Sequence, residues 1–140
     1  MMITIVASSV FAKQMVDYQD KLRELGHEVN LHEHYVRQAN GEMIDLIERM
    51  GKEHAQVKKE YDYIRYHYHE IVESDAILVL NFDKNGIKNY IGGNTLMEIG
   101  FAHVHNKKIF LLNPIPEISY NEEIEATDPI ILLGDLSKIV

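Results

Sequence analysis

The chain has 140 residues, of which 46% are hydrophobic and 26% are charged, and these values are typical of one globular domain spanning residues 1–140. The formal net charge of −8 argues against long nucleic acid as a partner, because phosphates are bound by Lys and Arg. The absence of cysteine excludes disulfides, thiol catalysis and thiolate metal sites, and fits the reducing cytoplasm in which we expect the protein to act.

The N-terminal segment, MMITIVASS, is predicted to be part of the fold. It lacks the basic flank of a signal peptide and runs directly into the first structural element. No apolar run in the chain approaches the roughly 18 residues needed to cross a bilayer. We therefore expect no membrane partner.

The first three elements have the pattern of a strand–helix–strand unit. Residues 2–6 form a short β-branched run, which predicts a buried strand. Residues 11–25 carry apolar side chains among charged ones and precede Gly26, which predicts a helix with a glycine stop. Residues 27–31 are predicted to be the second strand, so the unit has the length of a βαβ motif.

The middle of the chain contains its most polar helix and its most apolar strand. Residues 41–50 predict a short helix that Gly51 interrupts, and residues 53–73 predict one long helix rich in tyrosine and histidine. Residues 75–81 (DAILVLN) form a continuous apolar run, typical of a central parallel strand covered on both faces. Residues 82–93, with three glycines, are predicted to be a loop.

The last third continues the alternation of helices and strands. Residues 94–106 predict a helix, 108–112 a strand, 117–126 a short helix and 129–133 a final strand. The whole pattern predicts an α/β fold with a doubly wound, five-stranded parallel sheet, a flavodoxin-like three-layer sandwich.

Ligands of such sheets bind beyond the carboxyl ends of the strands, which directs attention to residues 7–11 and 81–94. The glycine pair at the end of the second loop lets the backbone approach a ligand closely. In the helix that follows, Glu98 is the only ionisable side chain between Thr95 and Ala102. A lone carboxylate in an apolar stretch is costly to bury unless something compensates it, so Glu98 is the leading candidate for chemistry.

A local structural role competes with this interpretation. Thr95 and Glu98 have the spacing of a capping box, in which the glutamate bonds back to the backbone amide of the helix start. The sequence pattern alone leaves both interpretations open.

Several segments, in matching order along most of the chain, resemble the nucleoside 2-deoxyribosyltransferase family, which includes nucleotide N-glycoside hydrolases. The matching segments are ITIVASS (3–9), LGHEV (25–29), SDAILVLN (74–81), GNTLMEIGFA (93–102) and KKIFLL (107–112). The segment around Glu98 is the most specific of these.

The resemblance implies that Glu98 is the nucleophile that attacks the anomeric carbon of a nucleoside or nucleotide. It places Ser8, Ser9 and Phe11 in a substrate-binding loop and Asp83 in a loop that carries a second acidic residue near the nucleobase. Where members of the family usually have an aspartate, eight residues before Asp75, this chain has His67. Proton transfer to the departing base would then fall to His67 or Asp83.

The predicted substrate contacts also include Gly92, Gly93 and Asn94 at the start of the helix. Serines and backbone amides in these loops could hold a 5′-phosphate or only a hydroxyl, and the two options stay open. Cleavage of an N-glycosidic bond through a carboxylate requires no cofactor. We therefore expect a small-molecule nucleoside or nucleotide as the partner and no cofactor.

The other distinctive residues receive structural interpretations. His67 and His69 diverge on their helix, as do His103 and His105, so no metal site is predicted. The tyrosines between residues 61 and 68 suit a half-wet subunit contact, and sites in the family resembled here are often completed by a neighbouring subunit, so we expect a homo-oligomer.

Three functional hypotheses follow. The first is cleavage or transfer at an N-glycosidic bond through Glu98. The second is a non-catalytic nucleotide-binding or sensing module with the same fold, which the replaced aspartate favours. The third, a flavodoxin-like flavin binder, is weaker because the first loop lacks a Thr/Ser-rich phosphate cradle.

Overall fold

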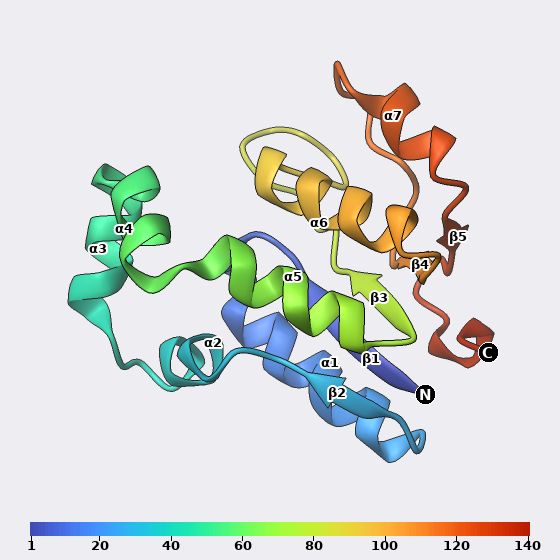
Figure 1. The fold of residues 1–140 in the computed structure, drawn as a ribbon, viewed down its shortest axis with the longest axis horizontal. Helices are drawn as coiled ribbons and strands as arrows, with labels where there is room; N and C mark the ends of the chain where they lie inside the picture. The colour runs from blue at the N-terminus through green and yellow to red at the C-terminus, as the bar shows by residue number, and fades with distance from the viewer.

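A computed structural model describes residues 1–140 and contains one five-stranded sheet in the order β2-β1-β3-β4-β5 (Figure 1). All neighbouring strands are parallel, with Ile3 opposite Ala76 and Ile77 opposite Ile109. The strands are β1 (Met2–Val6), β2 (Glu28–Asn30), β3 (Ala76–Val79), β4 (Lys108–Leu111) and β5 (Ile130–Ile131). The predicted doubly wound, flavodoxin-like sheet is therefore confirmed.

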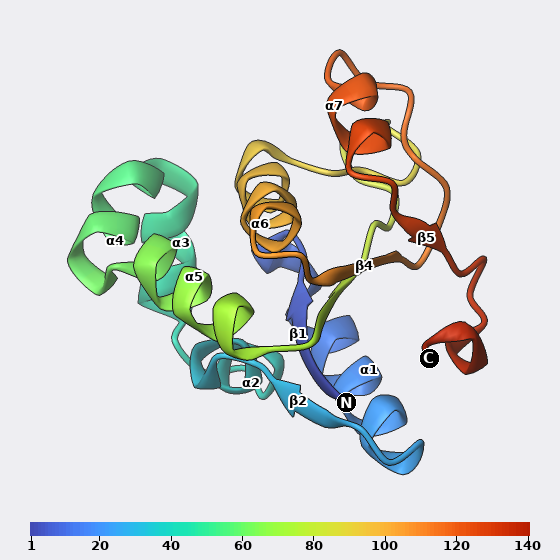
Figure 2. The same cartoon turned by 45° about the vertical axis from the view of Figure 1, so that its right-hand side comes forward.

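Helices cover both faces of this sheet, which gives the predicted three layers (Figures 1 and 2). The α-helices are α1 (Ala12–Glu24), α2 (Glu33–Ala39), α3 (Ile44–Lys52), α4 (His54–Tyr61), α5 (Tyr63–Glu73), α6 (Gly93–Val104) and α7 (Asn121–Ala126). Two short 3₁₀ helices, η1 (Ser9–Phe11) and η2 (Leu136–Lys138), complete the fold.

The alternation of side chains along the strands divides the core into two clusters. On one face, Ile3 and Leu78 pack with Met15 of α1. On the other face, Ile77 packs with Ile99 of α6 and with the buried side of α5. Because both faces of β3 are covered, its apolar run is continuous, as its sequence predicts.

The predicted long helix over residues 53–73 is wrong, because the chain breaks into α4 and α5 at Asp62. Asp62 has a left-handed backbone with φ 51°, a conformation that aspartate tolerates better than most residues. The break allows Val57 and Tyr63, on either side of it, to be buried together against Leu46 in a small third core. Burial of these side chains overrides the helical continuity that local propensity predicts.

Two further elements differ from the predictions. Helix α2 was not predicted; it begins after His32, whose Nδ1 accepts a hydrogen bond of 2.9 Å from the backbone N–H of His34. Gly51 does not end the predicted helix over residues 41–50, because α3 continues to Lys52. This helix also begins later than predicted, after Met43, which has a left-handed φ of 61°. No helix has both the length and the apolar character required to cross a membrane.

Asn81, directly after β3, joins the carboxyl ends of two strands. Its side chain donates to the backbone carbonyls of Asn113 and Pro114 at 2.9 and 3.1 Å and accepts from the backbone N–H of Asn113 at 2.9 Å. Asn81 is 0% exposed, so water cannot replace these bonds. This clamp holds the loop after β4 against the loop that leads to Glu98.

We expect Asn81→Ala to lower the free energy of unfolding by about 2 kcal/mol, because it leaves buried backbone groups without partners. Urea denaturation measures this loss. Gln14→Ala, at an exposed position of α1, is the control and is expected to change stability by less than about 0.5 kcal/mol. Equal stabilities of the two variants would contradict the importance of the clamp.

Candidate active site

A cavity of about 360 Å³ lies at the carboxyl ends of β1 and β3. Its walls come from the loop after β1, from α2, from α3 and α4, from the loop after β3 and from the first turn of α6. The strand order reverses between β1 and β3, and crevices at such reversals are the usual ligand sites of doubly wound sheets. The cavity therefore has the position that the sequence predicts for a ligand.

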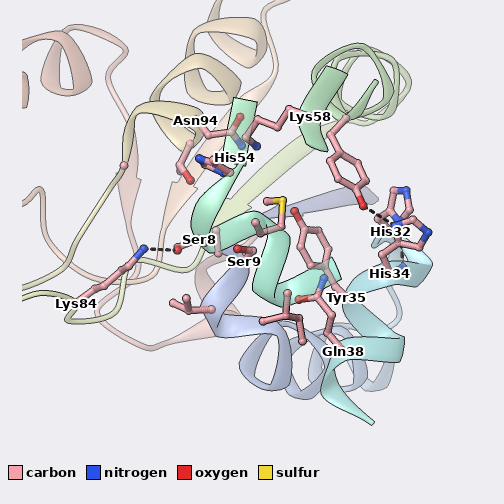
Figure 3. A pocket seen from close by; sticks show the side chains of 18 of the residues that line it. Ser8, Ser9, His32, His34, Tyr35, Gln38, His54, Lys58, Lys84 and Asn94 are labelled. Atoms are coloured by element: carbon pink, nitrogen blue, oxygen red, sulfur yellow. Dashed lines mark hydrogen bonds between the residues drawn. The ribbon is translucent and has the colours of Figure 1, made fainter. Parts of the chain in front are cut away.

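Five of the predicted substrate-binding residues line this cavity: Ser8, Ser9, Gly92, Gly93 and Asn94. They come from two loops far apart in sequence, which the parallel pairing of β1 and β3 brings together. Where these two loops meet, the Nζ atom of Lys84 donates a 2.9 Å hydrogen bond to the Oγ atom of Ser8 (Figure 3).

Phe11 and Asp83 lie outside the wall of the cavity. Phe11 is buried, and its ring centroid lies 5.3 Å from that of Phe82 in an edge-to-face contact. Asp83 is exposed, and its Oδ1 atom accepts a 2.9 Å hydrogen bond from the backbone N–H of Asn89, which stabilises the loop. The roles predicted for these two residues stay predictions.

Glu98 is buried, with 4% of its surface exposed, one layer behind the wall of the cavity. Its Oε1 atom accepts a 2.6 Å hydrogen bond from the side-chain amide of Asn94, which does line the cavity. Helix α6 begins at Gly93, after Gly92, and no side chain caps it. The capping-box interpretation is therefore wrong, because the start of the helix lies too early for Thr95 to be the capping residue.

Burial raises the pKa of Glu98 to about 8, and the charge of Lys58 partly opposes this shift. A carboxyl group with this pKa is largely protonated at pH 7 in the free protein. Carboxyl groups with strongly raised pKa values occur at functional sites more often than elsewhere, because stability alone does not favour them.

His67 is close to Glu98, with its Nδ1 atom 3.9 Å from Oε2. Its ring is nearly parallel to those of Tyr35 and Tyr63, with centroids 6.1 and 6.2 Å away. Burial, with added repulsion from His32 and Lys58, lowers the pKa of His67 to about 4. The imidazole is therefore neutral at pH 7 in the free protein, and its predicted role in proton transfer stays a prediction.

The cavity is electropositive although the protein as a whole is acidic. Lys58 and Lys84 line it together with His54, and no Asp or Glu side chain belongs to its wall. Burial lowers the pKa of Lys58, whereas the nearby Glu98 carboxylate raises it. A cavity with lysines and without carboxylates suits a small anionic ligand.

The far end of the cavity is aromatic and was not predicted from the sequence. Its side chains are His32, His34, Tyr35, Gln38 and Tyr63 (Figure 3). Most of them belong to α2 or to its N-terminal boundary, and this helix was not predicted from the sequence. The cap of this helix is His32, and histidine is not among the residues that usually signal a helix start, so the sequence carried no clear sign of α2.

No protein-family model and no curated protein matches this sequence. Among solved structures, the chain is similar to a CMP N-glycosidase from Clostridium botulinum, BcmB, with a TM-score of 0.54 and 16% sequence identity. The similarity covers 94% of this chain and 85% of that one. At this level of identity the comparison shows that the two proteins share a fold, and membership of the nucleoside 2-deoxyribosyltransferase family stays a prediction.

Proposed function

We propose that the protein cleaves the N-glycosidic bond of a nucleoside 5′-monophosphate, with Glu98 as the nucleophile. The observation that carries this proposal is the buried carboxyl group of Glu98, directly behind a lysine-lined cavity at the reversal point of the sheet. The fold shared with a protein that acts on the N-glycosidic bond of CMP supports the same class of reaction.

The chemistry follows from the positions of the side chains. Attack requires the ionised form of Glu98, so its carboxyl group first loses its proton. An oxygen of the carboxylate then attacks the anomeric carbon as the bond to the base breaks. The base leaves with the bonding electrons and takes up one proton, which balances the one that Glu98 gave up. Because the Asn94 side chain stands between Glu98 and the cavity, a bound sugar must displace this amide. Water then releases the sugar in a hydrolase, whereas a second base accepts it in a transferase.

The two ends of the cavity suit the two ends of a nucleotide. Ser8, Ser9 and Lys84, with the backbone at the start of α6, form a polar and cationic end suited to a phosphate. The aromatic end suits a planar base. Tyr35 lies there, and burial raises its pKa, so its hydroxyl keeps a proton that can be donated in a hydrogen bond to the base.

Lys84→Met is expected to weaken the binding of nucleoside monophosphates by about tenfold or more, because it removes the cation at the phosphate end. The affinity for the corresponding nucleosides is expected to change little. Isothermal titration calorimetry measures both. Lys88→Met, on the same loop but outside the cavity wall, is the matched control. Equal losses for nucleosides and nucleotides would contradict a phosphate site at Lys84.

The direct test of the proposed function is incubation of the protein with ribo- and deoxyribonucleosides and their 5′-monophosphates, followed by chromatography for free base. Addition of a second free base distinguishes transfer from hydrolysis. Intact-protein mass spectrometry during turnover is expected to detect a sugar adduct that maps to Glu98. The absence of base release from every compound would overturn the proposal.

The second candidate function is nucleotide binding without catalysis. The protonated state of Glu98 in the free protein and the Asn94 amide in front of it favour this alternative. Calorimetric binding of a nucleotide, with no base released over many hours, is the result that it predicts.

A further inference from the structure

Two ionisable side chains next to the cavity lack a partner of opposite charge. The carboxylate of Glu98 accepts a hydrogen bond only from the neutral amide of Asn94, and the nearest ring nitrogen belongs to His67, which is neutral at pH 7. Lys58 is half-buried, lines the cavity and forms no salt bridge. Burying a carboxylate or an ammonium group without a partner of opposite charge costs free energy. The charge of Lys58 would therefore stabilise an ionised Glu98, and the reverse also holds.

Lys58 reaches the cavity on a helical hairpin formed by α3 and α4. This hairpin projects beyond the end of the sheet in both views (Figures 1 and 2). It is held together by Arg49, which donates two hydrogen bonds to the Glu60 carboxylate at 3.0 and 2.8 Å. Residues with left-handed backbones, Met43 and Asp62, bound it on both sides. The hairpin is therefore a distinct unit, and one of its side chains facing the cavity is Lys58.

We propose that Lys58 is a positioning residue for the reaction: its ammonium group, in the cavity wall in front of Glu98, stabilises the ionised form of this carboxyl group and so favours the deprotonation that attack requires. This inference rests on the proposed role of Glu98. Lys58 and Asn94 both line the cavity and are drawn at the same edge of it in Figure 3, and Asn94 is the residue that hydrogen-bonds to Glu98.

The other groups that face this pair supply no competing charge. Glu98 is faced by His67 from α5 and by Tyr35 from α2, and both are neutral at pH 7. The charge of Lys58 is the one that opposes the raised pKa of Glu98. On the same helix, His54 lies one turn before Lys58. Burial and the charges of Lys58 and Lys84 lower the pKa of His54. Lys58 therefore supplies the positive charge that the carboxylate requires.

The test is a titration of the Glu98 carboxyl carbon by NMR in protein labelled at the glutamate side-chain carboxyl, with the signal assigned by its absence in Glu98→Gln. The variants are Lys58→Met, Lys58→Gln and Lys58→Arg, and the matched control is Lys59→Met, the exposed neighbour outside the cavity wall. Removal of the charge is expected to raise the titration midpoint by about half a pH unit or more. Lys58→Arg and the control are expected to retain the wild-type midpoint.

Turnover supplies a second readout. The pH at which kcat/KM rises is expected to move upward with the NMR midpoint in Lys58→Met, while the rates converge at high pH and Lys58→Arg restores activity at pH 7. An unchanged midpoint in both neutral variants overturns the interaction of Lys58 with Glu98, whatever the activity. If the Glu98 midpoint shifts in the neutral Lys58 variants but the wild type releases no base, the interaction of Lys58 with Glu98 is supported and the proposed function is overturned.

Discussion

Glu98→Gln is expected to lower the rate of base release by about a thousandfold or more, because glutamine retains the shape of the side chain but cannot capture the anomeric carbon. The amide can still accept a hydrogen bond from Asn94, so the wall of the cavity is expected to persist. Single-turnover measurements with a saturating nucleotide report this loss without the effects of product release. Calorimetry with the same nucleotide is expected to find an affinity within about threefold of the wild type.

The matched control for this variant is Glu73→Gln, at the exposed end of α5, which makes the same chemical change away from the cavity. It is expected to retain wild-type activity. If Glu98→Gln released base as fast as Glu73→Gln, the carboxylate mechanism would have to be abandoned. The adduct found by mass spectrometry in the wild type is expected to be missing in Glu98→Gln.

Glu98→Gln is also expected to stabilise the folded protein relative to the wild type at alkaline pH, by on the order of 3 kcal/mol at pH 8. The pKa of Glu98 rises from its ordinary 4.5 to about 8 on folding, so the native state holds a proton that the unfolded chain releases between these values. Wild-type stability is therefore progressively lost as the pH rises from about 4.5 through about 8. Glutamine carries no charge and does not incur this loss.

Thermal unfolding from pH 5 to pH 8 measures this effect as the difference in Tm between Glu98→Gln and the wild type. The difference is expected to be small at pH 5 and to reach several degrees at pH 8. His67 acts in the opposite direction, because its pKa falls to about 4 on folding and stability is gained as the pH rises from about 4 through 6.5. The causes of this lowered pKa are burial, His32 and Lys58 and not Glu98, so the contribution of His67 is expected to be similar in both proteins. A Tm difference independent of pH would contradict a raised pKa of Glu98.

The sequence by itself determined the sheet and the position of its ligand site. The β-branched run of β1 and the apolar run of β3 are local patterns, and a strand covered on both faces can be recognised without knowledge of its neighbours. Because the carboxyl ends of parallel strands share one edge of the sheet, Ser8 and Asn94 could be placed together from the sequence alone. The position of Glu98 behind the wall of the cavity was not predicted, because its apolar neighbours do not tell whether the carboxylate faces a cavity or the core.

Only the tertiary structure decided which charges and rings surround that carboxylate. Lys58 comes from a hairpin whose direction depends on the left-handed turn at Asp62, where burial of Val57 and Tyr63 outweighs local helix propensity. The protonation states of Glu98 and His67 depend on desolvation by residues far away in sequence, an effect that no local pattern encodes. Periodicity reports which face of a segment is buried, whereas the pKa of a buried group depends on everything packed against it.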